Sequence, residues 1–461
     1  MDLFTQFILD HEQDDTGRLL LGRGKWPGID MDLAVHTIEG RRRMRVKMPS
    51  WHVEPALRYP TRLCTEQCSS AATARYKARL AARILAGAIS DEDPVPATKG
   101  GRIADLTGGL GVDAWAFCQT AEQVLHNEMD LVLSEAVRHN FSRLGISNAV
   151  FRHACAEPGG IGAILGDFHP DLIFLDPARR AEDGRKVFRI EDCRPDVLLL
   201  KDELLRHAPH LLLKISPMAD ISLAAKQLNP GLREVHVVEA DGECKELLLW
   251  LDRSWDGPFR LVICQADRFP AGNPGGPADA GPAVLPFAPD AETRAVPRFA
   301  DDPHAWEGGL LFEPGKALSK AGLFNTLCDG TGLLKLSRHT HLYLVSPAVF
   351  RTDPQKGTTA AAILPFGKLF RIKEMHPFDG KTAKAVGKAW PRADVTARDL
   401  PLSSEELRKR LGVVSGSAVH IFGCRVACMT QGGAPKDSAR LIVAEPVSDR
   451  ESGSPVPFTG A

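Results

Sequence analysis

The chain has 461 residues, of which 44% are apolar and 25% charged, and its 57 Lys and Arg against 58 Asp and Glu give a formal net charge of −1. This composition is that of a globular protein of about three domains, and it excludes disordered and uniformly basic chains. No apolar run approaches the roughly 18 residues that a membrane helix needs. The N-terminal segment lacks a basic region and turns acidic at once, which argues against a secretory signal.

The ten cysteines are scattered along the chain rather than arranged as a disulfide framework. They favour free thiols in a reducing compartment, so we expect a cytoplasmic protein. Cys64/Cys68 and Cys424/Cys428 are spaced i,i+4 and lack the paired C-x-x-C knuckles of a zinc site. The sequence therefore predicts no metal centre.

Residues 1–98 form a predicted helical region, because apolar residues recur there with the spacing of amphipathic helices. The helical stretches are 4–11, 31–40 and 69–89. Basic side chains lie between them: Arg41, Arg42, Arg43, Arg45 and Lys47. Two interpretations of these side chains stay open, a solvated helix end or a contact with phosphate groups.

Residues 99–268 are predicted to fold as a Rossmann-like domain. Short apolar strands alternate there with helical stretches, which is typical of a parallel, doubly wound α/β sheet. The predicted strands are 102–107, 123–129, 149–155, 171–175, 210–215, 233–240, 243–251 and 259–265.

The rest of the chain is predicted to hold a linker and two small α+β modules. Residues 269–304 form the linker, because they contain eight Pro and four Gly. One module follows over 305–350 and a second over 365–447. The Ser/Gly/Pro-rich tail 448–461 is expected to be disordered.

A glycine-rich loop follows the first predicted strand of the Rossmann-like domain, in the segment Asp105-Leu-Thr-Gly108-Gly109-Leu-Gly111-Val-Asp113. Glycines allow a tight turn and let a ligand approach backbone N–H groups closely. The spacing differs from the G-x-G-x-x-G pattern that holds the diphosphate of NAD. An acid leads this loop instead, and a carboxylate disfavours a diphosphate but suits an ammonium group. S-adenosylmethionine has such a group and carries no phosphate.

Two further acids follow later strands. Glu128 ends the second strand, where an acid can accept hydrogen bonds from both hydroxyls of a ribose. Asp176 follows the fourth strand in Asp176-Pro177-Ala178-Arg179-Arg180. Because α/β sheets bind ligands at the carboxyl ends of their strands, we expect Asp176 at the reaction edge. The two arginines suit phosphate or carboxylate groups.

These motifs together resemble class I S-adenosylmethionine-dependent methyltransferases. The pieces that carry the resemblance are DLTGGLGVD at 105–113, Glu128, HNF at 139–141, LIFLDPARR at 172–180 and LKISPM at 213–218. More narrowly, the chain is similar to a bacterial methyltransferase family with a ferredoxin-like module and a C-terminal THUMP-like domain. Its further matching pieces are EQCSS with TARYKA at 66–78, EDCRPDV at 191–197, ECKELL at 243–248, LFEPGKALSKAGLF at 311–324, SRHTHLY at 337–343 and LPLSSEELRKRL at 400–411.

The resemblance implies methyltransferase activity with S-adenosylmethionine as cofactor, and it makes 305–350 ferredoxin-like and 365–447 THUMP-like. The expected cofactor-binding residues are Asp105, Gly108, Gly109, Gly111, Asp113, Glu128 and Asp176. One position departs from the family pattern, because Cys155 stands after the third strand where an acid often bonds the adenine amine. Cys155 is a poor acceptor, so a neighbouring backbone group or Glu157 is expected to substitute.

Three classes of methyl acceptor stay open. Methylation of an exocyclic amine usually shows an Asp/Asn-Pro-Pro-aromatic loop, and the aromatic is missing here. Methylation at C5 of a pyrimidine needs a Cys nucleophile, for which Cys193 is the near-site alternative. Methylation of a ring nitrogen or a ribose needs neither feature. We predict Asp176, Arg179 and Lys214 as acceptor-side catalytic residues; Lys214 would contact a phosphate, act with a pKa lowered by burial, or pair with Asp176.

The charge is divided unevenly along the chain. Residues 351–461 contain 8 Lys and 9 Arg against 6 Asp and 5 Glu, a balance of +6, which leaves −7 for the first 350 residues. A basic module joined to an acidic catalytic part is the layout expected for an RNA substrate. The candidate contacts are Arg371, Lys373, Lys381, Lys384, Lys388, Arg408, Lys409 and Arg410.

We therefore predict a methyltransferase that acts on structured RNA, ribosomal or transfer. The alternative is a non-catalytic RNA-binding scaffold that keeps the methyltransferase fold. A small molecule or a protein also stays open as the methyl acceptor.

Overall fold

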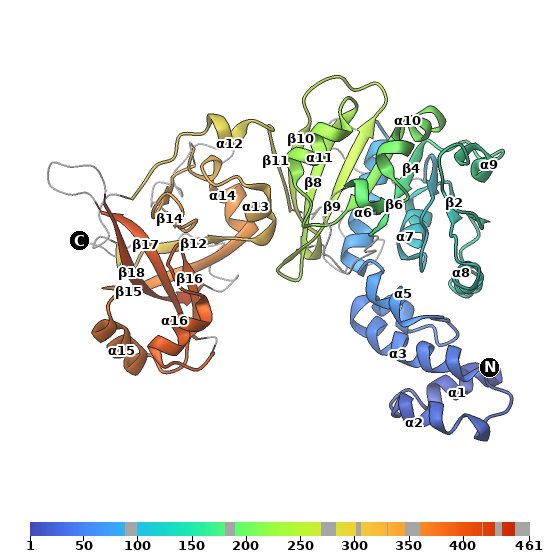
Figure 1. Cartoon of the computed structure of the whole chain (residues 1–461), viewed down its shortest axis with the longest axis horizontal. Coiled ribbons are helices and arrows are strands. Elements are labelled where there is room, and N and C mark those ends of the chain that lie inside the picture. The colour runs from blue at the N-terminus through green and yellow to red at the C-terminus, as the bar shows by residue number, and fades with distance from the viewer. Residues whose placement is uncertain are drawn as a thin grey trace. The chain divides into compact units, whose positions relative to one another are not determined.

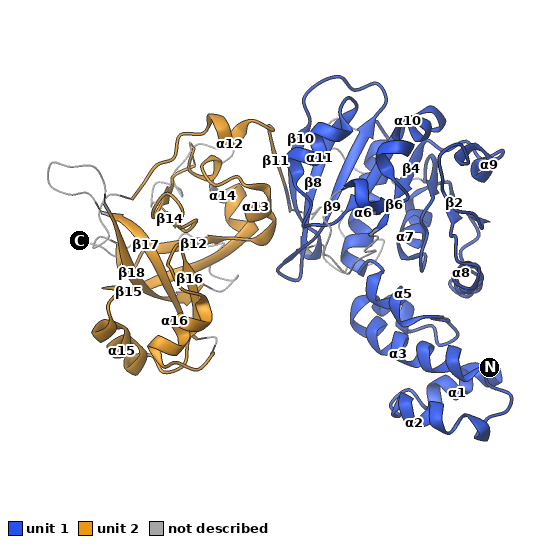
Figure 2. Cartoon of the chain, in the orientation of Figure 1, with its two compact units in different colours: residues 1–284 blue, residues 285–461 orange. Residues whose placement is uncertain are grey.

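The computed structural model describes residues 1–87, 99–179, 190–268, 283–300, 306–329, 331–345, 360–416, 418–428 and 436–447. They belong to two compact units, 1–284 and 285–461 (Figure 2). The predicted fold class is confirmed, since a helical N-terminal part precedes a large α/β sheet and smaller α+β modules follow. The tail 448–461 lies outside the described residues. Within the described part of the chain, no helix is long and apolar enough to cross a membrane.

The N-terminal part of unit 1 is helical, as predicted (Figure 1). Its helices are α1 (Leu3–Asp10), α2 (Thr16–Leu21), α3 (Met31–Lys47), α4 (Pro49–His52), α5 (Arg62–Gln67) and α6 (Ala71–Leu85). Most of them begin at a side chain that accepts a backbone N–H of the first turn, which stabilises a helix start. These N-caps are Asp2, Asp15, Asp30, Thr61 and Ser70.

The basic side chains of α3 hold the neighbouring helices. Arg41 is 3% exposed and forms an ion pair with Glu12 at 3.4 Å. Arg42 donates to two carbonyl oxygens of the α1–α2 connection, at 2.7 and 2.5 Å. Lys47 donates to two carbonyl oxygens in the last turn of α5, at 3.2 and 2.7 Å. Because these donors are used within the fold, the structure supports neither a solvated helix end nor a phosphate contact for Arg41, Arg42 and Lys47.

A nine-stranded sheet in the order β11-β10-β8-β9-β7-β4-β1-β2-β3 forms the centre of unit 1 (Figure 1). Its strands are β1 (Arg102–Asp105), β2 (Gln123–Asn127), β3 (Ala149–Arg152), β4 (Leu172–Leu175), β7 (His210–Ile215), β8 (Leu232–Ala240), β9 (Glu243–Asp252), β10 (Arg260–Gln265) and β11 (Ala283–Phe287). From β1 the chain winds to β2 and β3 in one direction, whereas β4 leads to β7 in the other. The winding direction therefore reverses between β1 and β4, and α/β sheets bind ligands at the strand ends beside such a reversal.

Helices cover this sheet and share cores with it. They are α7 (Val112–Thr120), α8 (Leu131–Arg143), α9 (Ile161–Leu165), α10 (Val197–His207) and α11 (Ile221–Leu228). One hydrophobic core joins Ile84 of α6, Phe117 of α7 and Phe141 of α8 to Phe174 of β4. The N-terminal helical region is thus packed into the same core as the Rossmann-like sheet.

The sheet is mixed, and the prediction of a parallel sheet is wrong for β9. This strand lies antiparallel between β7 and β8. The two-residue turn Asp241-Gly242 joins β8 to β9, with φ values of 53° and 70°. Such a turn has positive φ at both residues and connects antiparallel neighbours. An Asp-Gly pair between two apolar runs is a hairpin signal that the sequence already contained.

Unit 2 is built on a seven-stranded sheet in the order β13-β14-β12-β15-β18-β17-β16. Its strands are β12 (Leu310–Pro314), β13 (Leu333–Lys335), β14 (Tyr343–Val345), β15 (Gly367–Pro377), β16 (Asp394–Arg398), β17 (His420–Cys428) and β18 (Lys436–Pro446). Its helices are α12 (Ala291–Arg294), α13 (Lys316–Ala321), α14 (Ala360–Ile363), α15 (Gly380–Ala389) and α16 (Ser404–Leu411). Strand β12 of the first predicted module pairs with β15 of the second, so the two modules share one sheet.

The stretch 269–304, treated above as a linker, contains two short elements. Strand β11 lies at the edge of the nine-stranded sheet beyond β10, and α12 follows it. Pro286 is compatible with this position, because an edge strand leaves one row of backbone groups without a ladder partner. Residues 269–282 lie outside the described part of the chain.

Helices α15 and α16 approach each other closely at a glycine. Gly387 is buried, and a Cβ built on it would lie 1.7 Å from the carbonyl oxygen of Leu411. Around this contact Val386, Leu407 and Leu411 belong to one hydrophobic core. Only glycine allows the two helices to pack at this distance.

Gly387→Ala should therefore destabilise unit 2, by ~1–3 kcal/mol as is typical of overpacking. Gly380→Ala is the matched control, since a Cβ at that position of the same helix meets nothing within 4 Å. Calorimetry of the full chain should show a lower Tm for the first variant and an unchanged or slightly higher Tm for the second. Equal Tm values would contradict the close contact.

Candidate functional site

One large cleft lies at the carboxyl ends of β1, β2, β3 and β4, beside the reversal of winding. Its volume is about 1280 Å³. The loops that follow these strands line it, together with residues 191–196 and a segment of the N-terminal helical region. Of the predicted site residues, those that line the cleft are Asp105, Gly108, Gly109, Gly111, Asp113, Glu128 and Asp176.

The glycine loop turns tightly over the end of β2. A Cβ on Gly108 would lie 2.2 Å from Nε2 of His126, whose ring fills the space below the loop. Burial lowers the pKa of His126 to about 4, so this ring is neutral. Gly111 has φ of +78°, and a Cβ there would lie 2.7 Å from Val137. Packing thus requires glycine at Gly108, and both packing and backbone conformation require it at Gly111.

Asp105 is 1% exposed and stands at the base of the loop. Its Oδ1 accepts the backbone N–H of Thr107 at 3.1 Å. Burial raises its pKa well above the ordinary value, and the carboxylates of Asp113, Asp176 and Glu128 raise it further. Asp105 therefore stands among like charges at the cleft surface, an arrangement that a cationic ligand would relieve.

Glu128 supports the loop from the end of β2. Its two carboxylate oxygens accept the backbone N–H groups of Gly109 and Asp130, each at 2.8 Å. Each oxygen keeps further acceptor capacity, because an ionised carboxylate has about four lone-pair sites. Its place in the cleft wall is compatible with the predicted contact to a ribose.

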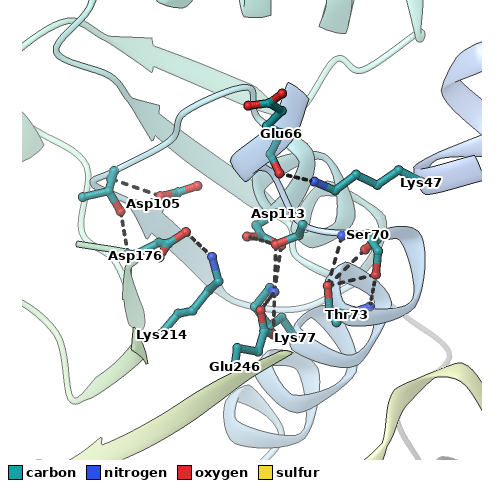
Figure 3. A network of polar contacts seen from close by, with 12 residues as sticks. Lys47, Glu66, Ser70, Thr73, Lys77, Asp105, Asp113, Asp176, Lys214 and Glu246 are labelled. Carbon is teal, nitrogen blue, oxygen red and sulfur yellow. Dashed lines mark hydrogen bonds and ion pairs between the residues drawn. The ribbon is translucent and has the colours of Figure 1, made fainter. Parts of the chain in front are cut away.

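Asp113 belongs to a buried network that the sequence did not reveal (Figure 3). Its Oδ2 accepts a hydrogen bond from Ser69 at 2.8 Å, and its Oδ1 pairs with Lys77 at 3.2 Å. The Lys77 ammonium also donates to Glu246 of β9 at 2.7 and 2.9 Å. Burial raises the pKa of Glu246, and the neighbouring lysines oppose that shift. The available signal was the position of Lys77 on the apolar face of a helix rich in Ala and Leu.

Asp176 and Lys214 form an ion pair (Figure 3). The backbone N–H of Asp176 donates to Oγ1 of Thr107 at 2.7 Å, which links this loop to the glycine loop. Burial alone would lower the pKa of Lys214, but the carboxylates of Asp176, Glu246 and Asp113 raise it above its ordinary value. Lys214 is therefore a fixed cation. Of the three roles considered for it, the ion pair is the one observed, and a lysine with lowered pKa is excluded.

The acceptor-side loop continues as a short ribbon. Strand β5 (Ala178–Arg179) pairs with β6 (Cys193–Arg194), so residues 191–196 lie against the loop that begins at Asp176. Arg179 has its backbone in β5, and its side chain lies outside the described part of the structure, as does all of Arg180. The nine cysteines described in the structure are free thiols.

The wall after β3 contains the position that departs from the family pattern. Cys155 is exposed there, and its Sγ lies 3.5 Å from Oε1 of Glu157. Both residues line the cleft. Glu157 thus supplies a carboxylate beside the cysteine, as expected of a substitute acceptor.

The cleft wall is strongly acidic. Its nine carboxylic acids are Asp105, Asp113, Glu128, Asp130, Glu157, Asp176, Glu191, Asp192 and Asp196. Among the described residues that line the cleft, Arg194 is the one Lys or Arg. Such a wall repels phosphate groups and attracts cations. No group of three or more potential metal ligands is found among the described side chains.

The Asp105→Asn variant should be more stable than wild type, by a margin that grows as the pH rises. Above the ordinary pKa of 3.8 the unfolded state releases the Asp105 proton, whereas the folded state retains it, so wild type loses stability toward the raised pKa. Asn keeps the shape and removes this cost of ~1.4 kcal/mol per unit of pKa shift. The Tm difference from wild type should therefore grow as the pH rises above about 4 in thermal unfolding.

Asp171→Asn is the control, because Asp171 is exposed at the opposite end of β4. Its Oδ2 accepts the backbone N–H of Arg102 at 2.8 Å, so this substitution changes one exposed hydrogen bond and does not touch the cleft. A pH-independent Tm difference for Asp105→Asn would mean that Asp105 is ionised in the folded protein.

Two family models match unit 2. A ferredoxin-like domain matches residues 310–349, and a THUMP domain-like model matches residues 367–445. No curated protein matches the chain.

A solved structure matches nearly the whole chain. A protein of Porphyromonas gingivalis W83 with a provisional methyltransferase assignment is 28% identical, with a TM-score of 0.74 over 96% of this chain and 98% of its own. A modification subunit from Vibrio vulnificus YJ016, provisionally of a type I restriction enzyme, gives a TM-score of 0.30 at 11% identity over 45% of this chain and 47% of its own. An rRNA methyltransferase of Streptomyces viridochromogenes gives 0.28 at 13% identity over 39% and 85%.

The last two TM-scores are too low to carry an argument. The Porphyromonas gingivalis protein spans nearly the whole length of both chains. The resemblance found in the sequence is thereby confirmed at the level of architecture: the chain shares its fold with that protein over nearly its whole length, and its C-terminal part contains a ferredoxin-like and a THUMP-like domain.

Proposed function

We propose that this protein transfers a methyl group from S-adenosylmethionine to structured RNA. The observation that carries the proposal is the acid-lined cleft beside the glycine loop, at the point where the winding of the sheet reverses. S-adenosylmethionine carries a sulfonium and an ammonium group and no phosphate, so its charge complements this wall. The fold shared with the Porphyromonas gingivalis protein supports methyl transfer as the reaction class.

The residues present fit this cofactor. Asp105 has no ion-pair partner among the described residues and would accept the ammonium end. The backbone at Gly108 and Gly109 allows close approach, and Glu128 would accept the ribose hydroxyls. The cleft exceeds the roughly 300–1,000 Å³ of a typical small-molecule site, which leaves room for an acceptor beside the cofactor.

The cofactor would supply an electrophilic methyl group on its sulfonium. The protein then has to position the acceptor and receive a proton where the acceptor atom loses one. Asp176 is suited to this role, since Lys214 holds its carboxylate and Thr107 fixes its backbone at the cleft. The reaction balances when an acceptor lone pair bonds the methyl carbon and the C–S electron pair stays on sulfur.

The RNA part of the proposal rests on unit 2. Lys381, Lys384 and Lys388 follow one face of α15 at helical spacing and are exposed. No hydrogen bond or ion pair is found for the side-chain ammonium groups of these lysines within the described residues, so the three ammonium groups remain available to phosphate groups. Four other candidate contacts have partners inside the unit: Arg371, Lys373, Arg408 and Lys409.

Isothermal titration with S-adenosylmethionine tests the cofactor. Wild type and Asp176→Asn should bind it, whereas Asp105→Ala should bind at least about tenfold more weakly, because it loses a contact between opposite charges. Asp171→Ala is the control and should bind like wild type. Absence of binding by wild type would refute the proposal.

Transfer of a labelled methyl group to total RNA from cells lacking the protein tests the reaction. Wild type should label one RNA species repeatedly. Asp176→Asn should label it at least ~100-fold more slowly despite binding the cofactor, because positioning and proton acceptance are lost. Cofactor binding without any labelling would favour the non-catalytic scaffold.

Replacing Lys381, Lys384 and Lys388 by Ala should weaken RNA binding similarly for all sequences. The slope of log affinity against log salt concentration should fall by ~2, since up to three phosphate contacts are lost. Cofactor binding should stay unchanged. Lys226→Ala, at an exposed position on α11 of unit 1, is the control. If this variant weakened RNA binding as much as the triple variant, α15 would not be a specific RNA-binding surface.

A further inference from the structure

A segment outside the Rossmann-like sheet forms one wall of the cleft. It consists of α5 and its connection to α6, and its lining residues are Thr61, Leu63, Cys64, Gln67, Cys68 and Ser69. None of the predicted site residues lies in this segment, so this wall was not anticipated. Its side chains face the same cleft as Asp105 and Asp176.

The α5 end of this segment is fixed on α3. The Lys47 ammonium donates to the carbonyl oxygens of Thr65 and Glu66, at 3.2 and 2.7 Å (Figure 3). A lysine at the end of a helix stabilises its unpaired carbonyl groups. Arg43 adds an ion pair to Glu66 at 3.5 Å.

The α6 end is fixed by buried polar contacts. Ser69 is 7% exposed and lies between Asp113, at 2.8 Å, and the ammonium of Lys77, at 3.0 Å. Ser70 and Thr73 form a capping box that sets the start of α6. With both ends anchored, the position of the intervening Gln67 is set by the fold.

Gln67 differs from its neighbours in the polar contacts that its side chain makes. The carboxylate of Glu66 pairs with Arg62 and Arg43, and Cys68 donates to a backbone carbonyl at 3.5 Å. Gln67 is exposed and lines the cleft, and within the described residues its carboxamide has no hydrogen-bond partner. The Gln67 carboxamide is thus a polar group in the cleft wall, on a segment anchored at both ends, and it makes no hydrogen bond within the described residues.

Residues 56–58, before α5, are anchored on α8 through His139 and Asn140. The segment that contains Gln67 leads from there to the anchors of α6. They lie on β8, through Tyr76 and His236 at 2.7 Å, on β9, through Glu246, and on the first turn of α7. In the sheet order, β8 and β9 lie on the same side of β1 as β4, which precedes Asp176, and α7 directly follows β1. Glu128 and residues 154–158 follow β2 and β3, on the other side.

We propose that Gln67 is a specificity-determining residue that hydrogen-bonds a nucleobase with an exocyclic amine as the methyl acceptor. This inference rests on the proposed function and deepens it. A carboxamide has both donors and an acceptor, and it matches an amine N–H beside a ring nitrogen with two hydrogen bonds. The carboxylate of Asp176 only accepts, so it takes the second N–H of the same amine.

This arrangement leaves the amine ready for transfer. With both N–H bonds held in the plane of the base, the nitrogen lone pair points out of that plane. It bonds the methyl carbon, the C–S bond breaks with its electrons on sulfur, and the proton lost by nitrogen passes to Asp176. A ribose hydroxyl offers a single O–H and would leave one of the two groups unused.

Two substitutions test the inference. Gln67→Ala removes the carboxamide, and Gln67→Glu keeps its shape but removes the donor. Both should lower kcat/KM for total RNA from cells lacking the protein by roughly tenfold or more, with a raised KM, while the dissociation constant for S-adenosylmethionine stays unchanged. Gln6→Ala is the matched control, since Gln6 is an exposed glutamine on α1 outside the cleft wall, and it should keep wild-type values.

Mass spectrometry of the nucleosides gives an independent readout. Wild type should produce a nucleoside methylated on an exocyclic nitrogen. A ribose or ring-carbon product, wild-type kinetics in Gln67→Ala, or loss of cofactor binding in that variant would each overturn the inference while leaving RNA methylation intact. A wild-type protein that labels no RNA would instead refute the proposed function, and this inference with it.

Discussion

A single buried ammonium group joins the N-terminal helices of unit 1 to its sheet. Lys77 is 0% exposed and lies within 2.7 to 3.2 Å of Glu246, Ser69 and Asp113. Removing one partner from a buried ion pair leaves an uncompensated charge and costs roughly 3–5 kcal/mol. Helix α6 is therefore tied to β9 and to the start of α7 at one point. The cleft wall at residues 61–69 and the first turn after the glycine loop both depend on that contact.

The placement of charge follows a consistent pattern around the cleft. The acids face the open space, whereas Lys77 and Lys214 lie behind them, in contact with Asp113 and Asp176. These cations hold carboxylates in place without neutralising the wall that a ligand meets. Asp105 has no such cation, and burial raises its pKa. The site thus keeps one acid in an unfavourable environment, which is a common feature of groups used in binding or catalysis.

Much of this site could be predicted from sequence because the glycine loop, Glu128 and Asp176 each follow a strand, and parallel strand ends meet at one edge. The rest depends on contacts without a local pattern. Lys77 and Glu246 are separated by 169 residues, and no sequence motif around either residue indicates that they are in contact. Gln67 stands in a matching sequence piece, but its place in the cleft follows only from the anchoring of α6. The antiparallel β9 was readable from Asp241-Gly242, yet the alternation of strands and helices favoured a parallel sheet.

The net charge of −1 conceals two opposite electrostatic environments. An acidic cleft suits a cationic cofactor and at the same time repels a phosphate backbone. An RNA acceptor could therefore place only its target base in the cleft, which requires that base to leave its stack. The attraction to phosphates has to come from another surface, and α15 offers exposed lysines without partners among the described residues. For the proposed cofactor and RNA, which carry opposite charges, separate acidic and basic surfaces are thus a physical requirement.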